Sequence, residues 1–190
     1  MVHLIPLSDA PQGSAEWLEA RKKGVGTTDA SAAIGLSPWK TPLELWEEKL
    51  GQGEEFKGNW FTSQGSAMEP VLRQHYADTF QVEVKNADCV LRHPEYDFVL
   101  ASPDGFTEDR LTEFKTSASR KSWGDVGTDE IPKHYMIQVQ QAMFVTGFEV
   151  CDVGVSFAGM EPVYYEVRSD AEIQDLILRD VMEFLSLIHI

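Results

Sequence analysis

Two acids and a lysine lie close together in the stretch ASPDGFTEDRLTEFKTSASR (101–120). Asp104 follows a proline, and Glu113 and Lys115 come later with one phenylalanine between them. Two carboxylates and a backbone carbonyl form a hard-oxygen site that suits Mg²⁺ or Mn²⁺. A lysine beside such a site can polarise or deprotonate a metal-bound water, so these residue types predict metal-assisted hydrolysis of a phosphodiester.

The strand pattern of LTEFKT (111–116) would hold these groups together. In an extended strand successive side chains alternate between two faces, so Glu113 and Lys115 share one face and Phe114 points to the other. Asp104 ends the preceding predicted strand, where a hairpin partner brings it beside Glu113. The alternative is a charged surface hairpin, because this loose spacing of acids and a lysine arises readily in an acidic chain.

The composition predicts one globular domain over residues 1–190 with an acidic surface. The hydrophobic fraction is 43%, and 31 acidic residues against 16 basic ones give a net charge of −15. A surface of that charge cannot attract phosphate everywhere, which argues against a protein that simply coats DNA. Contact with DNA would have to be local, through the basic clusters Arg21-Lys22-Lys23, Arg120-Lys121 and Lys133-His134.

Several other classes of protein are disfavoured. The opening MVHLIPLSDAPQG lacks the charged and apolar regions of a signal peptide. No stretch approaches the roughly 20 apolar residues that span a bilayer. Cys89 and Cys151 form no CxxC motif, and the histidines form no HxxxH pair. These features predict a cytoplasmic protein with no membrane segment and no zinc or histidine-rich metal site.

Hydrophobic periodicity, caps and breakers predict alternating helices and strands. Helices are expected over 14–24, a short alanine-rich segment that ends at Gly35, 41–51, about 60–79, 132–147, and a final segment capped by Ser169 with Glu172 as its partner. Strands are expected over 81–85, 88–92, 98–102, 111–116, 150–158 and 162–168. This order predicts an α/β fold with a central mixed β-sheet flanked by helices.

The segment TPLELWEEKLG (41–51) has the strongest local helix signature. Thr41 and Glu44 form a capping box ahead of the apolar positions. The buried stripe of this helix is predicted to consist of Leu43, Trp46 and Leu50. Trp39 lies in the loop before the helix, so it is a better candidate than Trp46 for stacking on a DNA base.

Four separate motifs resemble those of a known nuclease family. The motif SPDG…EFK (102–115) is preceded by QGSAMEP (64–70) and followed by HYMIQVQQAMFVTG (134–147), and the earliest of the four is RKKGVGTTDASAAIGLSPWKTPLELW (21–46). In this order they resemble the phage lambda exonuclease and YqaJ-type viral recombinase branch of the PD-(D/E)xK nuclease superfamily. The resemblance spans residues 21 to 147 and implies the PD-(D/E)xK nuclease core.

The resemblance implies a role for each matching residue at the cleavage site. Asp104 and Glu113 match the metal-binding acids, and the carbonyl of Phe114 matches a further metal ligand. Lys115 matches the motif lysine beside the attacking water.

Two further matches have structural alternatives. Glu69 matches an acid near the second metal position or its water, and the alternative is a glutamate on a helix surface. Gln138 matches a motif glutamine that contacts the site through its side chain. Its alternative is a polar helix face shared with His134 and Gln141.

In the family, a pocket holds the 5′-phosphate at the end of a duplex. Arg21 and Ser102 match that pocket, and Thr28 matches a serine hydroxyl there. Arg120 matches as well when one residue is gapped after Lys115. An arginine fork and hydroxyl groups suit a terminal phosphate. For Arg21, the alternative is the solvated end of an amphipathic helix.

The resemblance implies a Mg²⁺-dependent exonuclease of phage or prophage origin that degrades linear double-stranded DNA 5′→3′ in the cytoplasm of a bacterial host. The product would be a 3′ single-stranded overhang for recombination, with a single-strand annealing protein as partner. A ring-shaped trimer, basic inside and acidic outside, would reconcile the net charge with DNA binding. Two alternatives stay open: a restriction-like or RecB-like endonuclease, which would cut closed circular DNA, and a DNA-binding recombination accessory protein with a dead site.

Overall fold

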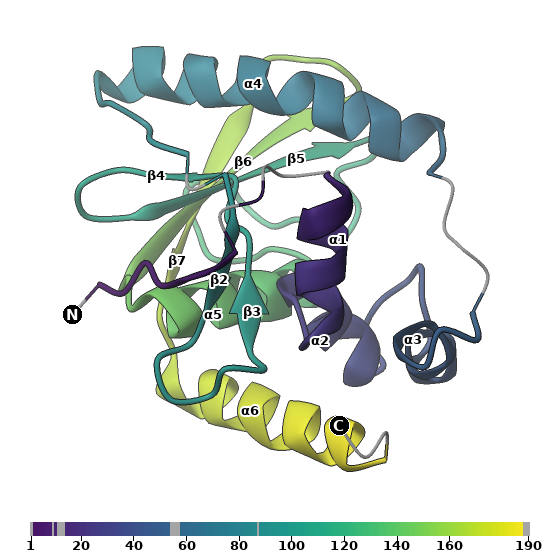
Figure 1. Cartoon of the computed structure of the whole chain (residues 1–190). Helices are drawn as coiled ribbons and strands as arrows, with labels where there is room; N and C mark the ends of the chain where they lie inside the picture. Colours follow the sequence, from purple (N-terminus) through teal and green to yellow (C-terminus); the bar gives the residue numbers. More distant parts are fainter. Residues whose placement is uncertain (1, 9, 11–13, 54–57, 87, 188–190) are drawn as a thin grey trace.

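A computed structural model describes residues 2–8, 10, 14–53, 58–86 and 88–187 of the chain (Figure 1). The elements follow in the order β1 (Pro6–Ser8), α1 (Ala15–Lys22), α2 (Thr27–Ala33), α3 (Pro42–Lys49), α4 (Trp60–Phe80), β2 (Val90–Arg92), β3 (Leu100–Ala101), β4 (Gly105–Phe106), β5 (Leu111–Ser117), α5 (Lys133–Thr146), β6 (Val150–Phe157), β7 (Val163–Arg168) and α6 (Ala171–Ser186). Figure 1 shows α4 along one side of the strands and α5, then α6, on the other side.

The larger sheet has four strands in the order β4-β5-β6-β7. β5 and β6 run parallel, with Glu113 opposite Val153, and the other neighbours are antiparallel. Parallel neighbours need a crossover connection, and α5 supplies it between β5 and β6. β1, β2 and β3 form a smaller antiparallel sheet. The strand that carries Glu113 is therefore an inner strand of a mixed sheet.

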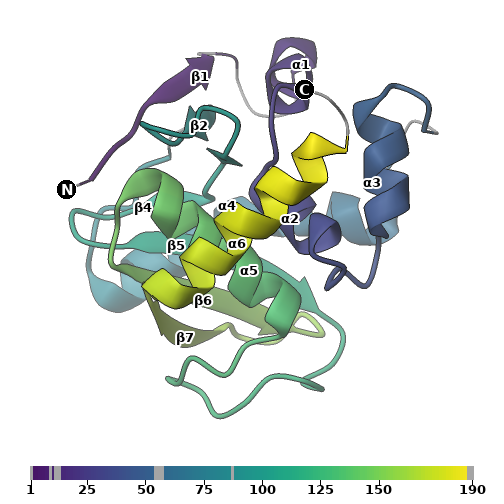
Figure 2. The same ribbon diagram turned by 90° about the horizontal axis from the view of Figure 1, so that it is seen from below.

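The two faces of the larger sheet are buried against different helices. Leu111 of β5 belongs to a buried apolar cluster with Met143 of α5. Phe114 of β5 belongs to another cluster with Tyr76 of α4. Figure 2 shows α6 crossing over α5, so that α5 lies between α6 and the sheet. Both contacts remove apolar surface from water, which stabilises the layered arrangement.

The predicted α/β fold with a mixed sheet is confirmed, and so are the main helices. α4 continues without a break through Gly65 and Pro70. Ser14 caps α1, and the capping box of Thr41 and Glu44 opens α3 as predicted. No helix in the described part of the chain is long and apolar enough to cross a membrane.

The strand predictions were partly wrong. Residues 81–85 form no strand, because Gln81 ends α4 in a left-handed conformation with φ of 54° and only Lys85 bridges to Phe106. The sequence pattern does not predict β1 and β4, since strands of two or three residues show too little alternation.

Two details of the helices also differ from the sequence-based prediction. The stripe predicted for α3 is wrong: Leu43 and Leu50 are exposed, whereas Leu45 is fully buried in a cluster with residues of α2 and α6. α3 therefore packs through a different side, and Trp46 is only partly buried there. The cap of α6 is Asp170 instead of Ser169, because the Asp170 carboxylate accepts the first free N–H groups of the helix.

Candidate active site

A pocket of about 150 Å³ opens where the β4–β5 hairpin approaches α1, α2 and α5. Most of the residues singled out from the sequence line it: Arg21, Thr28, Ser102, Asp104, Glu113, Lys115 and Gln138. Glu69 and Arg120 are not among the lining residues. The lining residues come from segments that are far apart in the chain, so the tertiary fold brings them together.

The side chain of Asp104 accepts a backbone hydrogen bond of β5 that the neighbouring strand does not accept. β4 pairs only with Leu111 and Thr112. The N–H of Phe114 donates instead to Oδ2 of Asp104 at 2.7 Å. The N–H and C=O of one strand residue point to the same edge, so the Phe114 carbonyl faces the side on which the Asp104 carboxylate lies. Two of the predicted oxygen donors are therefore presented at one edge of the sheet.

Glu113 and Lys115 are held together on the face of β5 that α5 covers. Nζ of Lys115 donates to Oε2 of Glu113 at 2.7 Å and lies 3.8 Å from Oδ2 of Asp104. Burial, together with the Asp104 charge, raises the pKa of Glu113 to about 7 although Lys115 opposes the shift. Burial alone would lower the pKa of Lys115, but the two carboxylates raise it. The ammonium therefore stays charged and can polarise a neighbouring group.

Glu69 lies on α4 and is connected to the site by Arg73, a residue that the sequence-based prediction missed. Nη2 of Arg73 donates to Oε1 of Glu69 at 2.5 Å, and its Nε donates to the backbone oxygen of Asp104 at 3.0 Å. Burial and then the Asp104 charge raise the pKa of Glu69. The i, i+4 spacing of Glu69 and Arg73 was the available signal. Arg73 thus links α4 to the loop that carries the first acid.

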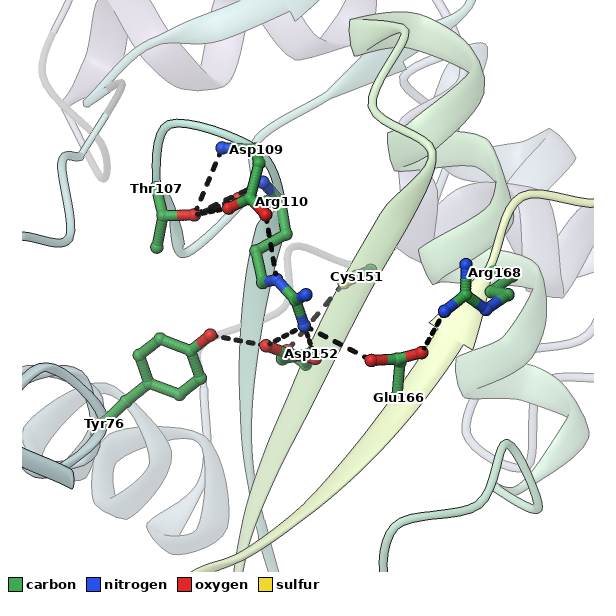
Figure 3. Close-up of polar contacts among 8 residues, drawn as sticks. All are labelled: Tyr76, Thr107, Asp109, Arg110, Cys151, Asp152, Glu166 and Arg168. Atoms are coloured by element: carbon green, nitrogen blue, oxygen red, sulfur yellow. Dashed lines mark hydrogen bonds and ion pairs between the residues drawn. The ribbon is translucent and has the colours of Figure 1, made fainter. Parts of the chain in front are cut away.

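A partly buried ion-pair network anchors the hairpin that carries the two acids (Figure 3). Nη1 of Arg110 donates to both carboxylate oxygens of Asp152 at 3.1 Å and to Glu166 at 3.3 Å. The hydroxyl of Tyr76 on α4 donates to the same Asp152. Removing one partner would leave a buried charge poorly compensated. The network therefore fixes the hairpin against β6, β7 and α4.

The residues predicted to bind phosphate do not all converge. Three of them line the pocket beside the two acids: Arg21, Thr28 and Ser102. The guanidinium of Arg21 lies 4.7 Å from the ring centroid of Trp17. The guanidinium of Arg120 instead lies 4.7 Å from the ring centroid of Phe157, because β5 ends at Ser117 and the chain then leaves the sheet.

A buried ion pair behind the pocket was also missed. Nζ of Lys49 donates to Oδ2 of Asp29 at 2.9 Å, and the two side chains are only 4% and 6% exposed. The same ammonium donates to the backbone oxygens of Arg21 and Gly24 at 3.3 and 2.6 Å. The N–H of Gly26 donates to Oδ2 of Asp29 at 3.4 Å. This Lys49–Asp29 clamp joins the end of α3 to the loop between α1 and α2.

Gln138 and Gln141 do not form the solvent-facing polar surface that the alternative interpretation requires. Both side chains are buried, and Gln138 lines the pocket. The amide of Gln141 donates to the backbone oxygens of Val25 and Leu100, each at 2.9 Å. Gln141 therefore ties the loop before α2 to β3, while Gln138 is available to the pocket.

The donor atoms at the β5 edge fit a small, hard cation. No group of three or more histidine, cysteine, aspartate or glutamate side chains suited to a metal occurs within the described residues. The candidate donors are the carboxylates of Asp104 and Glu113 and the carbonyl of Phe114, and all of them are oxygens. The raised pKa of Glu113 indicates a buried site that disfavours uncompensated negative charge, which a cation would relieve.

The chain is similar in sequence to a bacterial protein and to a viral protein. It is 35% identical over 179 residues to the protein YqaJ of Bacillus subtilis (strain 168), which covers 89% of this chain and 54% of YqaJ. It is 32% identical over 155 residues to protein R354 of Acanthamoeba polyphaga mimivirus, which covers 74% of this chain and 28% of R354. The chain thus spans about half, or less, of the length of these relatives.

The fold is shared with solved structures at lower sequence identity. An alkaline exonuclease (LHK-Exo) from Laribacter hongkongensis superposes with a TM-score of 0.75, 20% identity and 93% coverage of both chains. A phage-related exonuclease from Haemophilus somnus 129PT superposes with a TM-score of 0.66 and 14% identity, covering 87% of this chain and 93% of that chain. The profile of the YqaJ-like viral recombinase domain matches residues 16–149. This match covers most of the chain, which therefore belongs to the YqaJ-like viral recombinase domain family.

Proposed function

We propose that this chain is a metal-dependent DNA exonuclease. The observation that carries the proposal is the arrangement at β5. The Asp104 carboxylate accepts a hydrogen bond from the N–H of Phe114, and the ammonium of Lys115 contacts the carboxylates of both Glu113 and Asp104. The fold of solved exonucleases and membership of the recombinase family support the same conclusion.

In this proposal Asp104, Glu113 and the carbonyl of Phe114 hold Mg²⁺ or Mn²⁺. The cation, when bound, supplies positive charge at the scissile phosphate and lowers the pKa of water. Lys115, kept protonated by its two carboxylate neighbours, adds a fixed positive charge where negative charge develops. Glu69 and Gln138 would orient water or the phosphate around this centre.

The end of the strand would be held by the other half of the pocket. Arg21, Thr28 and Ser102 offer a guanidinium and hydroxyl groups next to the two acids, which suits a terminal 5′-phosphate. A site that binds this terminus beside the cleavage centre would favour digestion in the 5′→3′ direction. The result would be a 3′ single-stranded overhang, suited to an annealing protein in recombination. Arg120, packed on Phe157, is left out of this pocket.

The net charge of −15 has to be reconciled with DNA binding. We favour a ring-shaped homotrimer in the cytoplasm of a bacterial host, with its basic residues on the inner surface and its acids outside. Such a ring would also retain a strand and digest it processively. Light scattering that shows a monomer at working concentration, together with distributive digestion, would contradict this assembly.

The nuclease proposal is tested with 5′-phosphorylated linear duplex DNA in Mg²⁺ and then in EDTA. We expect digestion only with the cation and only from an end. Cutting of covalently closed circular DNA would favour the endonuclease alternative. Binding of DNA with no digestion in Mg²⁺ or Mn²⁺ would favour the accessory-protein alternative.

A further inference from the structure

Trp39 is an exposed aromatic residue close to the candidate active site. It lies between α2 and α3, and 64% of the residue is exposed. Its ring meets His134 edge-on, with centroids 4.8 Å apart, and lies 5.9 Å from the centroid of Tyr135. These contacts hold the indole against the first turn of α5 and leave most of it open to solvent.

Tyr135 connects Trp39 to the cleavage centre. Nζ of Lys115 lies 5.6 Å from the ring centroid of Tyr135. The same Lys115 is the one that bridges toward Glu113 and Asp104. Tyr135 therefore contacts both Trp39 and Lys115, which places Trp39 near the lysine of the site.

The pocket itself is too small to hold the bases of a DNA strand. Its volume is about 150 Å³, whereas sites for drug-sized ligands measure roughly 300–1,000 Å³. A phosphate fits this volume, and bases further along the strand would lie outside it, on the rim. The first turn of α5 carries no acid, and its N-terminus has no side-chain cap, so this part of the rim is compatible with a phosphate backbone.

We propose that Trp39 stacks on an unpaired base of the DNA strand whose phosphate occupies the pocket. This inference rests on the proposed nuclease function. Every base offers a π-face, so stacking on an indole holds a strand without selecting its sequence. Leu43 on α3 is also exposed, so a second protein chain could cover this face in place of a DNA base. The experiment below distinguishes the two occupants.

The test measures the binding of 5′-phosphorylated single-stranded oligonucleotides in EDTA, each with one abasic position that is moved along the strand. Wild-type protein should bind about 5- to 150-fold more weakly when the stacked base is missing. Trp39→Ala should weaken binding of the intact strand by a similar factor and lose nothing further at that abasic position. Trp39→Phe should keep most of the affinity and most of the positional effect.

Leu43→Ala is the matched control, because it removes an exposed apolar side chain of the neighbouring helix. It should bind DNA like the wild type. The same abasic profile in wild type and Trp39→Ala would overturn the stacking. A change of oligomer size in both Trp39→Ala and Leu43→Ala would also overturn it and assign this face to a protein contact.

A parallel digestion of linear duplex in Mg²⁺ separates the two proposals. If the wild type digests the duplex but the abasic profile is the same in wild type and Trp39→Ala, only the stacking is refuted. If Trp39→Ala removes the effect of the abasic position on binding but the wild type does not digest the duplex, only the nuclease function is refuted.

Discussion

Replacement of Lys49 by methionine tests whether the Lys49–Asp29 clamp supports the phosphate half of the pocket. Both side chains are almost fully buried, so Lys49→Met leaves the Asp29 carboxylate without its main partner. Burial alone would raise the pKa of Asp29, and the Lys49 and Arg21 charges hold it below its ordinary value. Breaking a buried pair in this way costs about 3–5 kcal/mol of folding free energy. For a chain of this length, that corresponds to a fall in Tm of roughly 6–20 °C.

The double variant Asp29→Asn/Lys49→Met removes the charge left behind. It should recover much of the lost stability in urea denaturation, because no uncompensated charge stays buried. Lys40→Met is the matched control, since the Lys40–Glu48 pair is partly exposed and should contribute no more than about 1 kcal/mol. The reasoning is refuted if Lys49→Met costs no more than Lys40→Met, or if the double variant is no more stable than Lys49→Met.

The clamp should also affect activity in a selective way. Lys49 holds the backbone of Arg21 and Gly24, which leads into the predicted 5′-phosphate pocket. The double variant, which restores charge balance, should therefore lose part of the preference for 5′-phosphorylated over 5′-hydroxyl ends at a temperature where it is folded. Equal losses on the two kinds of end would make the clamp purely structural.

Four further predictions concern the site itself. Asp104→Ala should abolish Mg²⁺-dependent digestion and leave the circular dichroism spectrum unchanged, and near wild-type digestion would contradict the metal assignment. Lys115→Ala should lower the cleavage rate at least about a hundredfold while Mn²⁺ binding survives, because it removes a charge that stabilises the transition state. Arg21→Ala should reduce digestion of 5′-phosphorylated ends more than that of 5′-hydroxyl ends, and equal losses would indicate general DNA binding. In the folded state the pKa of Glu113 is raised to about 7 from 4.5, so the contribution of this group to stability is complete below pH 4.5 and is lost as the pH rises through 7. Glu113→Gln should therefore raise the Tm of metal-free protein more at pH 8 than at pH 5.

Local patterns in the sequence were sufficient for most elements and for the chemistry of β5. The alternation of LTEFKT places Glu113 and Lys115 on one face and Phe114 on the other, and the structure has this arrangement. The capping box of Thr41 and Glu44 is equally local. Such features depend on residues two to four positions apart, so they can be read without knowledge of the fold.

Which side of a helix is buried was decided by tertiary packing. In α3 the spacing of Leu43 and Leu50 suggested a stripe, but α2 and α6 cover the side that carries Leu45. A short amphipathic helix with apolar residues on more than one side can pack in more than one way. The neighbouring elements then select the face, and these neighbours are distant in sequence.

Sequence patterns predicted only part of the convergence of the site. The strand pattern predicted a hairpin that brings Asp104 beside Glu113, and the antiparallel pairing of β4 with the start of β5 provides it. Lys49 and Asp29, which support the pocket, carry no local signature because their contact joins two different helices. The resemblance placed Arg120 at the pocket, with one residue gapped after Lys115, yet its guanidinium packs on Phe157 of the parallel strand β6. Sequence spacing therefore determines which chemistry the side chains can perform, whereas long-range pairing and burial decide which of them meet.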